Sequence, residues 1–132
     1  GVVTAASFLG EVGDLTRYED WRQLRKMAGL NLIENSSGDR KGKTGISKRG
    51  RPGLRCILYQ ASLTLVATNP EFKALYQFLK TRRENPLKGK QALVVIACKL
   101  LRVMFTLVKE NRLYNPEKVL GSYREQQLKN AA

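Results

Sequence analysis

Residues 88-KGKQALVVIACKLLRVMFTLVKENR-112 contain the longest apolar pattern in this 132-residue chain. Their large apolar side chains recur at helical spacing, which predicts a long amphipathic helix. The residues in this pattern are Leu93, Ala97, Leu100, Met104 and Val108. Lys99, Arg102 and Lys109 fall on another face, and the first two interrupt the apolar run. We therefore expect the central core helix of a helical domain and no membrane span.

Four more segments have the spacing of helices. The expected helices cover residues 2–14, 18–30, 51–69 and 70–85. Thr4 is the expected cap of the first, Gly29 the expected end of the second, and Pro70 separates the last two. Residues 115–132 show only weak periodicity and are expected to form a mobile tail. Together these segments predict a mainly α, compact domain of four to six helices.

The helix expected over residues 51–69 has an apolar face and a polar face. Its apolar face contains Leu54, Ile57, Leu58, Ala61 and Leu65. Arg51, Arg55, Tyr59 and Ser62 fall on the other face. Tyr59 lies there beside Arg55, so it is the aromatic residue that we expect to touch a ligand. The aromatic residues expected in the core are Trp21, Phe72, Tyr76 and Phe105.

The charge balance sets the class of partner. The chain has 24 Lys and Arg but only 11 Asp and Glu, which gives a net charge of +13. Such an excess attracts polyanions, either nucleic acid or an anionic membrane surface. The chain contains no histidine, which excludes Ser-His-Asp and Cys-His nucleophiles and the common zinc sites. Cys56 and Cys98 stand in apolar surroundings and are expected to be buried free thiols.

Residues 34-ENSSGDRKGKTGISKRGRPGLR-55 join two adjacent serines to a basic, glycine-rich stretch. The lack of periodicity over residues 31–53 predicts a long basic Gly-rich loop, with a short extended piece around residues 44–46. Glycine-rich backbone that leads into a helix N-terminus can bind phosphate. The expected phosphate or nucleic-acid contacts in and beside this stretch are Arg40, Lys41, Lys43, Lys48, Arg49, Arg51, Arg55 and Tyr59. Lys99 and Arg102 on the long helix are further candidates.

Each of these features also has a plain structural explanation. The basic stretch could be a solvated linker, and the cationic face of the long helix could simply face water. Ser36 and Ser37 could be turn residues, a common place for serine. Alternatively, a serine at the head of a basic loop suits phosphoryl transfer, because positioning and positive charge around the phosphate supply much of that catalysis.

Four short elements occur in order within residues 28–62. They are Gly29-Leu30, Ser37-Gly38, Ile46-Ser47-Lys48 with Gly50, and Leu54-Arg55 with Leu58-Tyr59. In this combination they resemble the C-terminal domain of bacterial insertion-sequence transposases of the IS-one-ten/IS-one-sixteen type, which are related to Piv-type DNA invertases. Residues 1–30 look like the second half of a helix-hairpin-helix element and the helix after it, and residues 90–100 match the family's Lys-x-Ala…Lys-Leu helix. The resemblance covers nearly the whole chain.

The resemblance implies a recombinase with two catalytic parts. An N-terminal RuvC-like domain would supply four acidic residues for Mg²⁺, and the C-terminal domain would supply a serine that becomes covalently linked to DNA. Ser37, directly before Gly38, matches the family's nucleophile, whereas Ser36 occupies a variable position. The carboxylates here are scattered and form no two-metal set. Residues 1–132 are therefore expected to be an excised C-terminal domain that holds no cofactor itself and is inactive alone.

The implied partners are DNA, at the element ends and the target, and the RuvC-like domain of the same protein. At least some family members also use a guide non-coding RNA, and the full-length protein is expected to form a homo-oligomer. No membrane partner is expected, and the start of the chain shows no signal-peptide pattern, so the expected location is the bacterial cytoplasm, at the nucleoid. The alternative function is a non-enzymatic helical module that binds DNA or RNA through its basic loop.

Overall fold

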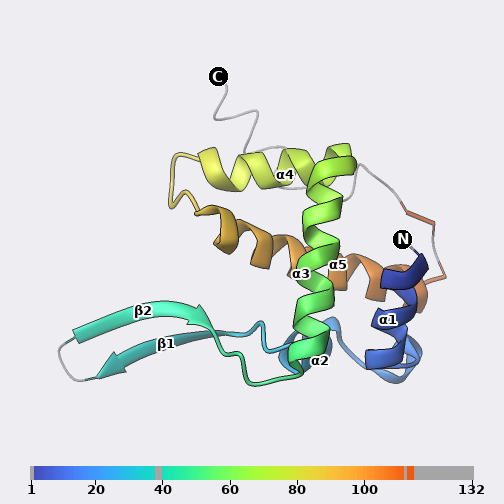
Figure 1. Ribbon diagram of the computed structural model, residues 1–132. Coiled ribbons are helices and arrows are strands. Elements are labelled where there is room, and N and C mark those ends of the chain that lie inside the picture. Colours follow the sequence, from blue (N-terminus) through green and yellow to red (C-terminus); the bar gives the residue numbers. More distant parts are fainter. Residues whose placement is uncertain (1, 38–39, 112, 115–132) are drawn as a thin grey trace.

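The computed structural model describes residues 2–37, 40–111 and 113–114, and the side chains of these residues except Val2 and residues 33–44. Within this part of the chain there are five α-helices, a short 3-10 helix and two strands (Figure 1). In chain order they are α1 (Val2–Val12), η1 (Leu15–Arg17), α2 (Trp21–Met27), β1 (Leu32–Ser37), β2 (Arg40–Ile46), α3 (Pro52–Thr68), α4 (Pro70–Thr81) and α5 (Gly89–Lys109). The prediction of a mainly helical domain is confirmed. The tail expected over residues 115–132 lies outside the described residues.

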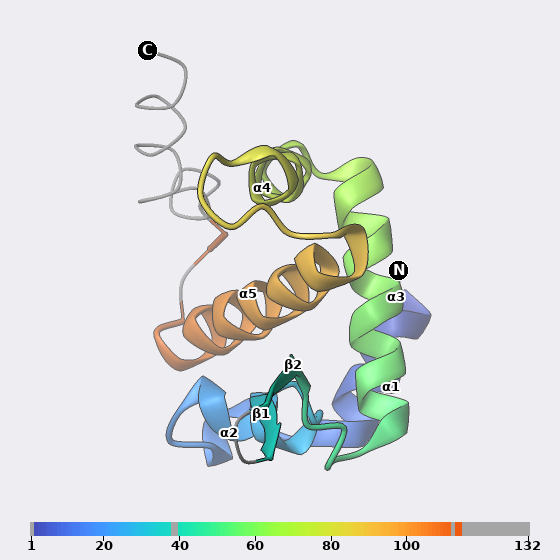
Figure 2. The same cartoon turned by 90° about the vertical axis from the view of Figure 1, so that its left-hand side faces the viewer.

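Helix α5 is the centre of the core, as its length and apolar content predict. Figures 1 and 2 show it crossing the middle of the molecule, with α4 on one side and α2 on the other, while α3 runs across α4 and α5 and contacts both. Residues of α5 belong to two buried clusters, one shared with α1, η1, α2 and α3, the other with α4. By length and composition alone α5 could cross a bilayer, contrary to expectation. Its packing on both sides identifies it as a core helix.

The buried faces of α3 and α5 differ from the predicted ones. On α5 the larger cluster takes Ala97, Leu101 and Phe105, whereas the predicted Leu100 and Met104 are half-buried and Val108 is exposed. On α3 the fully buried row is Leu54, Leu58 and Ser62. Residues four apart form a nearly straight row along a helix, and a helix packed closely against a neighbour buries that row. The apolar faces predicted for α3 and α5 were instead derived from the average helical spacing of apolar residues.

Ser62 was expected on a polar face but is completely buried. Its hydroxyl donates a hydrogen bond of 2.7 Å to the carbonyl oxygen of Leu58, so the buried group is satisfied within its own helix. Among the aromatic residues, Phe72 and Phe105 are buried as predicted, whereas Trp21 and Tyr76 are only half-buried.

The ends of the first helices follow local chemistry. Thr4 does not cap α1, because the helix already includes Val2. Helix α2 starts from a capping box, in which Asp20 accepts a hydrogen bond from a helix amide and Gln23 accepts one from the backbone of Asp20. Gly29 ends this segment as predicted, with a left-handed φ of +72°.

The prediction of a long loop over residues 31–53 is wrong for most of that range. Strands β1 and β2 pair antiparallel, from Leu32 opposite Ile46 to Ser37 opposite Arg40, with an irregularity between Glu34 and Ser36. The extended piece expected around residues 44–46 is the end of β2. Pairing the strands satisfies backbone groups that a loop would leave to water. Only residues 47–51 connect the hairpin to α3.

Asn69 ends α3 and starts α4. Its side-chain oxygen accepts hydrogen bonds of 3.1 Å from the amides of Glu71 and Phe72. Asn69→Ala is expected to lower the free energy of unfolding by about 1 kcal/mol, because two amides of the first turn lose their acceptor. Urea denaturation measures the change. Lys73→Ala, at an exposed position of α4, is the control and should have little effect; equal losses in both variants would contradict the capping role.

Candidate nucleic-acid interface

The base of the hairpin is fixed to the end of α2 by backbone hydrogen bonds. Three amides of residues 47–51 donate to carbonyl oxygens of residues 27–31. The pairs are Ser47 to Asn31 at 2.7 Å, Lys48 to Gly29 at 3.0 Å, and Arg51 to Met27 at 2.7 Å. We call these two segments the hairpin seat. The seat brings together Gly29-Leu30 and Ile46-Ser47-Lys48 with Gly50, two elements that the sequence separates.

Two glycines are required at the seat because the backbones approach each other closely. A Cβ on Gly50 would lie 2.3 Å from the carbonyl oxygen of Met27 and 2.5 Å from the amide nitrogen of Gly29. A Cβ on Gly29 would lie 2.7 Å from Nη1 of Arg55, and its φ is also positive. No side chain fits at Gly50 unless the backbone moves. The glycines of the motif therefore have a packing role.

Two of the predicted phosphate ligands contact the protein itself. Nη1 of Arg55 donates a hydrogen bond of 3.3 Å to the carbonyl oxygen of Ala28, and the side chain is half-buried. Nη1 of Arg51 donates to the carbonyl oxygen of Glu11 in α1. Both arginines thus attach the start of α3 to neighbouring elements. A guanidinium has five N–H donors, so each keeps donors for a phosphate.

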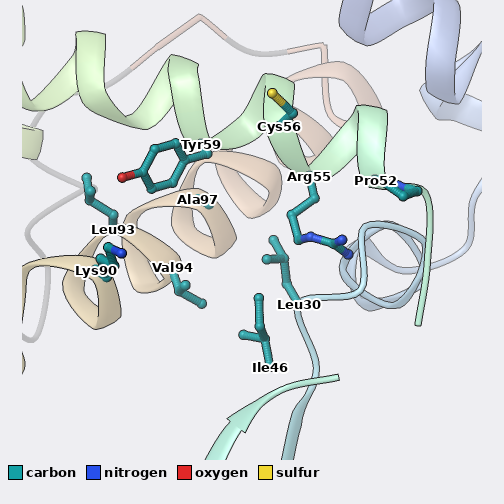
Figure 3. Close-up of a pocket in the computed structure, with 10 residues that line it drawn as sticks. All are labelled: Leu30, Ile46, Pro52, Arg55, Cys56, Tyr59, Lys90, Leu93, Val94 and Ala97. Carbon is teal, nitrogen blue, oxygen red and sulfur yellow. The ribbon is translucent and has the colours of Figure 1, made fainter. Parts of the chain in front are cut away.

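A pocket of about 380 Å³ opens between α3, α5 and the hairpin seat (Figure 3). It is lined by Leu30, Ile46, Pro52, Arg55, Cys56, Tyr59, Lys90, Leu93, Val94 and Ala97. Figure 3 shows Tyr59 and Lys90 toward one end and the guanidinium of Arg55 toward the other. The sequence placed Arg55 and Tyr59 together on one helix face but did not single out Lys90 as a ligand contact. The one sequence feature that could have pointed to Lys90 was its position as the first residue of the Lys-x-Ala pattern.

The other predicted contacts lie elsewhere. Arg40, Lys41 and Lys43 belong to β2, and their side chains lie outside the described ones; in the strand register Ser36 is opposite Lys41, and Ser37 opposite Arg40. Lys48 and Arg49 are exposed at the seat.

Lys99 and Arg102 lie on α5 but do not line the pocket. Lys99 is half-buried, and its pKa is lowered by burial and by the charge of Arg102. The third basic residue of this face, Lys109, donates a hydrogen bond of 3.0 Å to the carbonyl oxygen of Thr16 and lies over the ring of Phe105. The face is thus partly used for packing.

The two cysteines differ in exposure, which corrects the expectation that both are buried. Cys56 is exposed and lines the pocket, whereas Cys98 is half-buried and burial raises the pKa of its thiol. Because the thiolate is the reactive form, iodoacetamide near neutral pH should alkylate Cys56 much faster than Cys98. Timed quenching followed by peptide mass spectrometry measures both rates. Equal rates would contradict this difference in exposure between the two thiols.

The carboxylates of the described residues do not fit a magnesium site. No group of three or more Asp, Glu, Cys or His side chains that could hold a metal ion occurs in this part of the chain. We therefore assign no metal-dependent step to the described residues.

Comparison with known proteins places the chain in a family. The family model described as "Transposase IS116/IS110/IS902 family" matches residues 1–77, which run from α1 through the hairpin and its seat into α4. The chain is 32% identical over 116 residues to a 44.8 kDa protein of insertion element IS116 from Streptomyces clavuligerus, covering 88% of this chain and 28% of that protein. It is 30% identical over 117 residues to the transposase for insertion sequence element IS1111A from Coxiella burnetii, covering 86% and 31%. The chain thus spans less than a third of either relative. It belongs to the IS116/IS110/IS902 transposase family.

Proposed function

We propose that this chain is the nucleophile-bearing, DNA-binding domain of a transposase, and that Ser37 attacks a DNA phosphate. The observation that carries the proposal is the strand register: Ser37 is opposite Arg40 in the last pair before the turn. The hairpin extends away from the helical body (Figure 1), so the end that carries Ser37 and Arg40 is remote from the core. A serine here can meet a DNA backbone, with the basic residues of β2 beside it.

The proposed step exchanges one phosphodiester bond for another. The Ser37 oxygen forms a bond to phosphorus as its proton is lost, and the bond from phosphorus to one sugar oxygen breaks. That sugar oxygen leaves as a hydroxyl after it takes up a proton. Because the new serine–DNA bond replaces the broken one, the strand end can later be joined to another hydroxyl without an energy source. Arg40, opposite Ser37, would offset charge on the phosphate, whereas Lys48 lies at the other end of the hairpin, at its seat.

The remaining roles belong to the full-length protein. We propose that a RuvC-like domain outside residues 1–132 holds Mg²⁺ with its own acidic residues, as the family resemblance implies. A homo-oligomer and a guide RNA are proposed on the same ground. The matched relatives are more than three times as long as the matched segment, which leaves room for such a domain. Residues 1–132 alone are expected to bind DNA without cleaving it.

The test uses the full-length protein, labelled DNA that carries the element ends, and the element's RNA where one is found. The reaction is denatured and run on a gel, and label that migrates with protein is digested with trypsin. The expected adduct lies on the tryptic peptide of residues 27–40, and fragmentation assigns it to Ser37. Recombination without any protein-linked DNA would overturn the covalent mechanism. The non-enzymatic module, in which the hairpin only follows a DNA or RNA backbone, would then be the better description.

A further inference from the structure

We propose that the pocket between α3, α5 and the hairpin seat binds one unpaired nucleobase of the DNA, with Lys90 at one end and Arg55 at the other near the phosphates on the two sides of that base. This inference rests on the proposed function as a DNA-binding domain and adds a second contact, remote from Ser37. An unpaired base is required because a paired base is stacked inside the duplex and has to leave it before it can enter a protein pocket.

The size and the walls of the pocket suit a base. Its volume of about 380 Å³ lies in the range of sites that take small organic ligands, which are mostly apolar with a few polar groups. The apolar part of the wall is formed by Leu30, Pro52, Ile46, Leu93, Val94 and Ala97, from three different parts of the chain. A base that leaves its stack needs such a surface to cover its faces.

An exposed aromatic ring stands at the pocket. Tyr59 is 41% exposed, so part of its ring is accessible to a ligand. Aromatic rings are the usual stacking partners of unpaired bases, since every base has a flat π face. Figure 3 shows the Tyr59 ring at the same end as the Lys90 ammonium group, so a stacked base would place its phosphate near a cation.

The charges at the pocket complement a phosphate. Its ten lining residues include two cations, Arg55 and Lys90, and no carboxylate. Arg55 is held in place by its hydrogen bond to Ala28, so it needs little ordering when a ligand binds. An apolar side chain from a second copy or another domain would leave both cations without an anion, so it fits less well than a nucleotide.

The polar groups are too few to read the edge of a base. Apart from Arg55 and Lys90, the side chains at the pocket that can hydrogen-bond are the Tyr59 hydroxyl and the Cys56 thiol. Stacking without edge contacts tolerates all four bases. The pocket should therefore select an unpaired state and show little preference for sequence.

Cys56 provides a direct test, because it is exposed and lines the pocket. The full-length protein is treated with iodoacetamide, and modification of the tryptic peptide of residues 56–73 is followed by mass spectrometry. Single-stranded DNA at about ten times its Kd should slow alkylation of Cys56 about tenfold, since only the empty pocket reacts. A duplex of the same sequence, and a single strand with abasic sites, each at ten times its own Kd, should protect far less.

The matched variants are Tyr59→Ala and Leu63→Ala. Both residues are exposed on α3, but Leu63 does not line the pocket. Protection should be lost in Tyr59→Ala and kept in Leu63→Ala, with each protein assayed at ten times its own Kd and checked for folding by circular dichroism.

Binding measured by fluorescence anisotropy on the same DNA separates this inference from the proposed function. If single-stranded DNA binds but leaves Cys56 unprotected, the pocket inference fails and the proposed function stands. The inference also fails if abasic DNA protects equally, or if Tyr59→Ala keeps full protection. If no DNA binds, both fail.

Discussion

Ser37→Ala in the full-length protein is expected to abolish the serine–DNA adduct and to lower recombination by about 10⁴-fold or more, the scale seen when a covalent nucleophile is removed. DNA binding should stay within about twofold, since one uncharged hydroxyl adds little to an affinity set by many phosphate contacts. The adduct is measured on denaturing gels, recombination by counting joined products, and binding by anisotropy.

Ser36→Ala is the matched control. The two serines are neighbours in β1, opposite Lys41 and Arg40 respectively, so either substitution makes a similar change to the strand. Ser36→Ala should keep the adduct and recombination. Loss of the adduct in Ser36→Ala alone would move the nucleophile to Ser36. Full recombination in both variants would mean that neither serine is the nucleophile.

The helices were predictable because their signals are local. Spacing of apolar residues, the Asn69-Pro70 break and Gly29 each act within one or two turns, and all three appear at the expected places. The choice of buried row was not predictable, because it depends on which neighbour a helix meets. Ser62 is the clearest case: only the packing of α3 decides that this hydroxyl is buried.

The hairpin was missed because its residues give no strand signal. Residues 40–46 are rich in Lys and Gly, and they do not alternate polar and apolar side chains. The five glycines of residues 38–53 were interpreted as signs of a loop that could bind phosphate. In the structure Gly45 lies within β2, and Gly50 lies at the seat. Tertiary contact with residues 27–31 is what fixes this segment, and no short-range pattern reveals it.

The candidate site was predictable in part. Arg55 and Tyr59 share a helix face in the sequence and do line one pocket. The intramolecular hydrogen bonds of Arg51 and Arg55, and the place of Lys90 and Cys56 in the pocket wall, depend on how α1, α2 and α5 pack. Charge alone therefore did not predict which cations line a pocket and which are used for contacts within the fold.

Gly50→Ala is expected to destabilise the protein strongly, by about 2 to 4 kcal/mol in the free energy of unfolding. The added methyl group would lie 2.3 Å from one backbone atom and 2.5 Å from another, and no side-chain rotation can relieve contacts with backbone. The hairpin would have to move off the end of α2. That movement strains or breaks the hydrogen bonds of the seat, starting with the one from the Arg51 amide to the carbonyl oxygen of Met27.

Gly10→Ala is the control for Gly50→Ala. Gly10 lies in α1, and a Cβ there would meet nothing within 4 Å, so alanine should stabilise the helix by roughly 0.5 to 1 kcal/mol. Urea denaturation measures both variants, and an unchanged midpoint for Gly50→Ala would contradict the close approach at the seat. The adduct assay extends the test to function. Ser37 is intact in Gly50→Ala, so loss of the adduct in the protein that remains folded would show that the seat positions the hairpin on DNA. Retention of the adduct at the normal rate would mean that the hairpin reaches its phosphate without being held by α2.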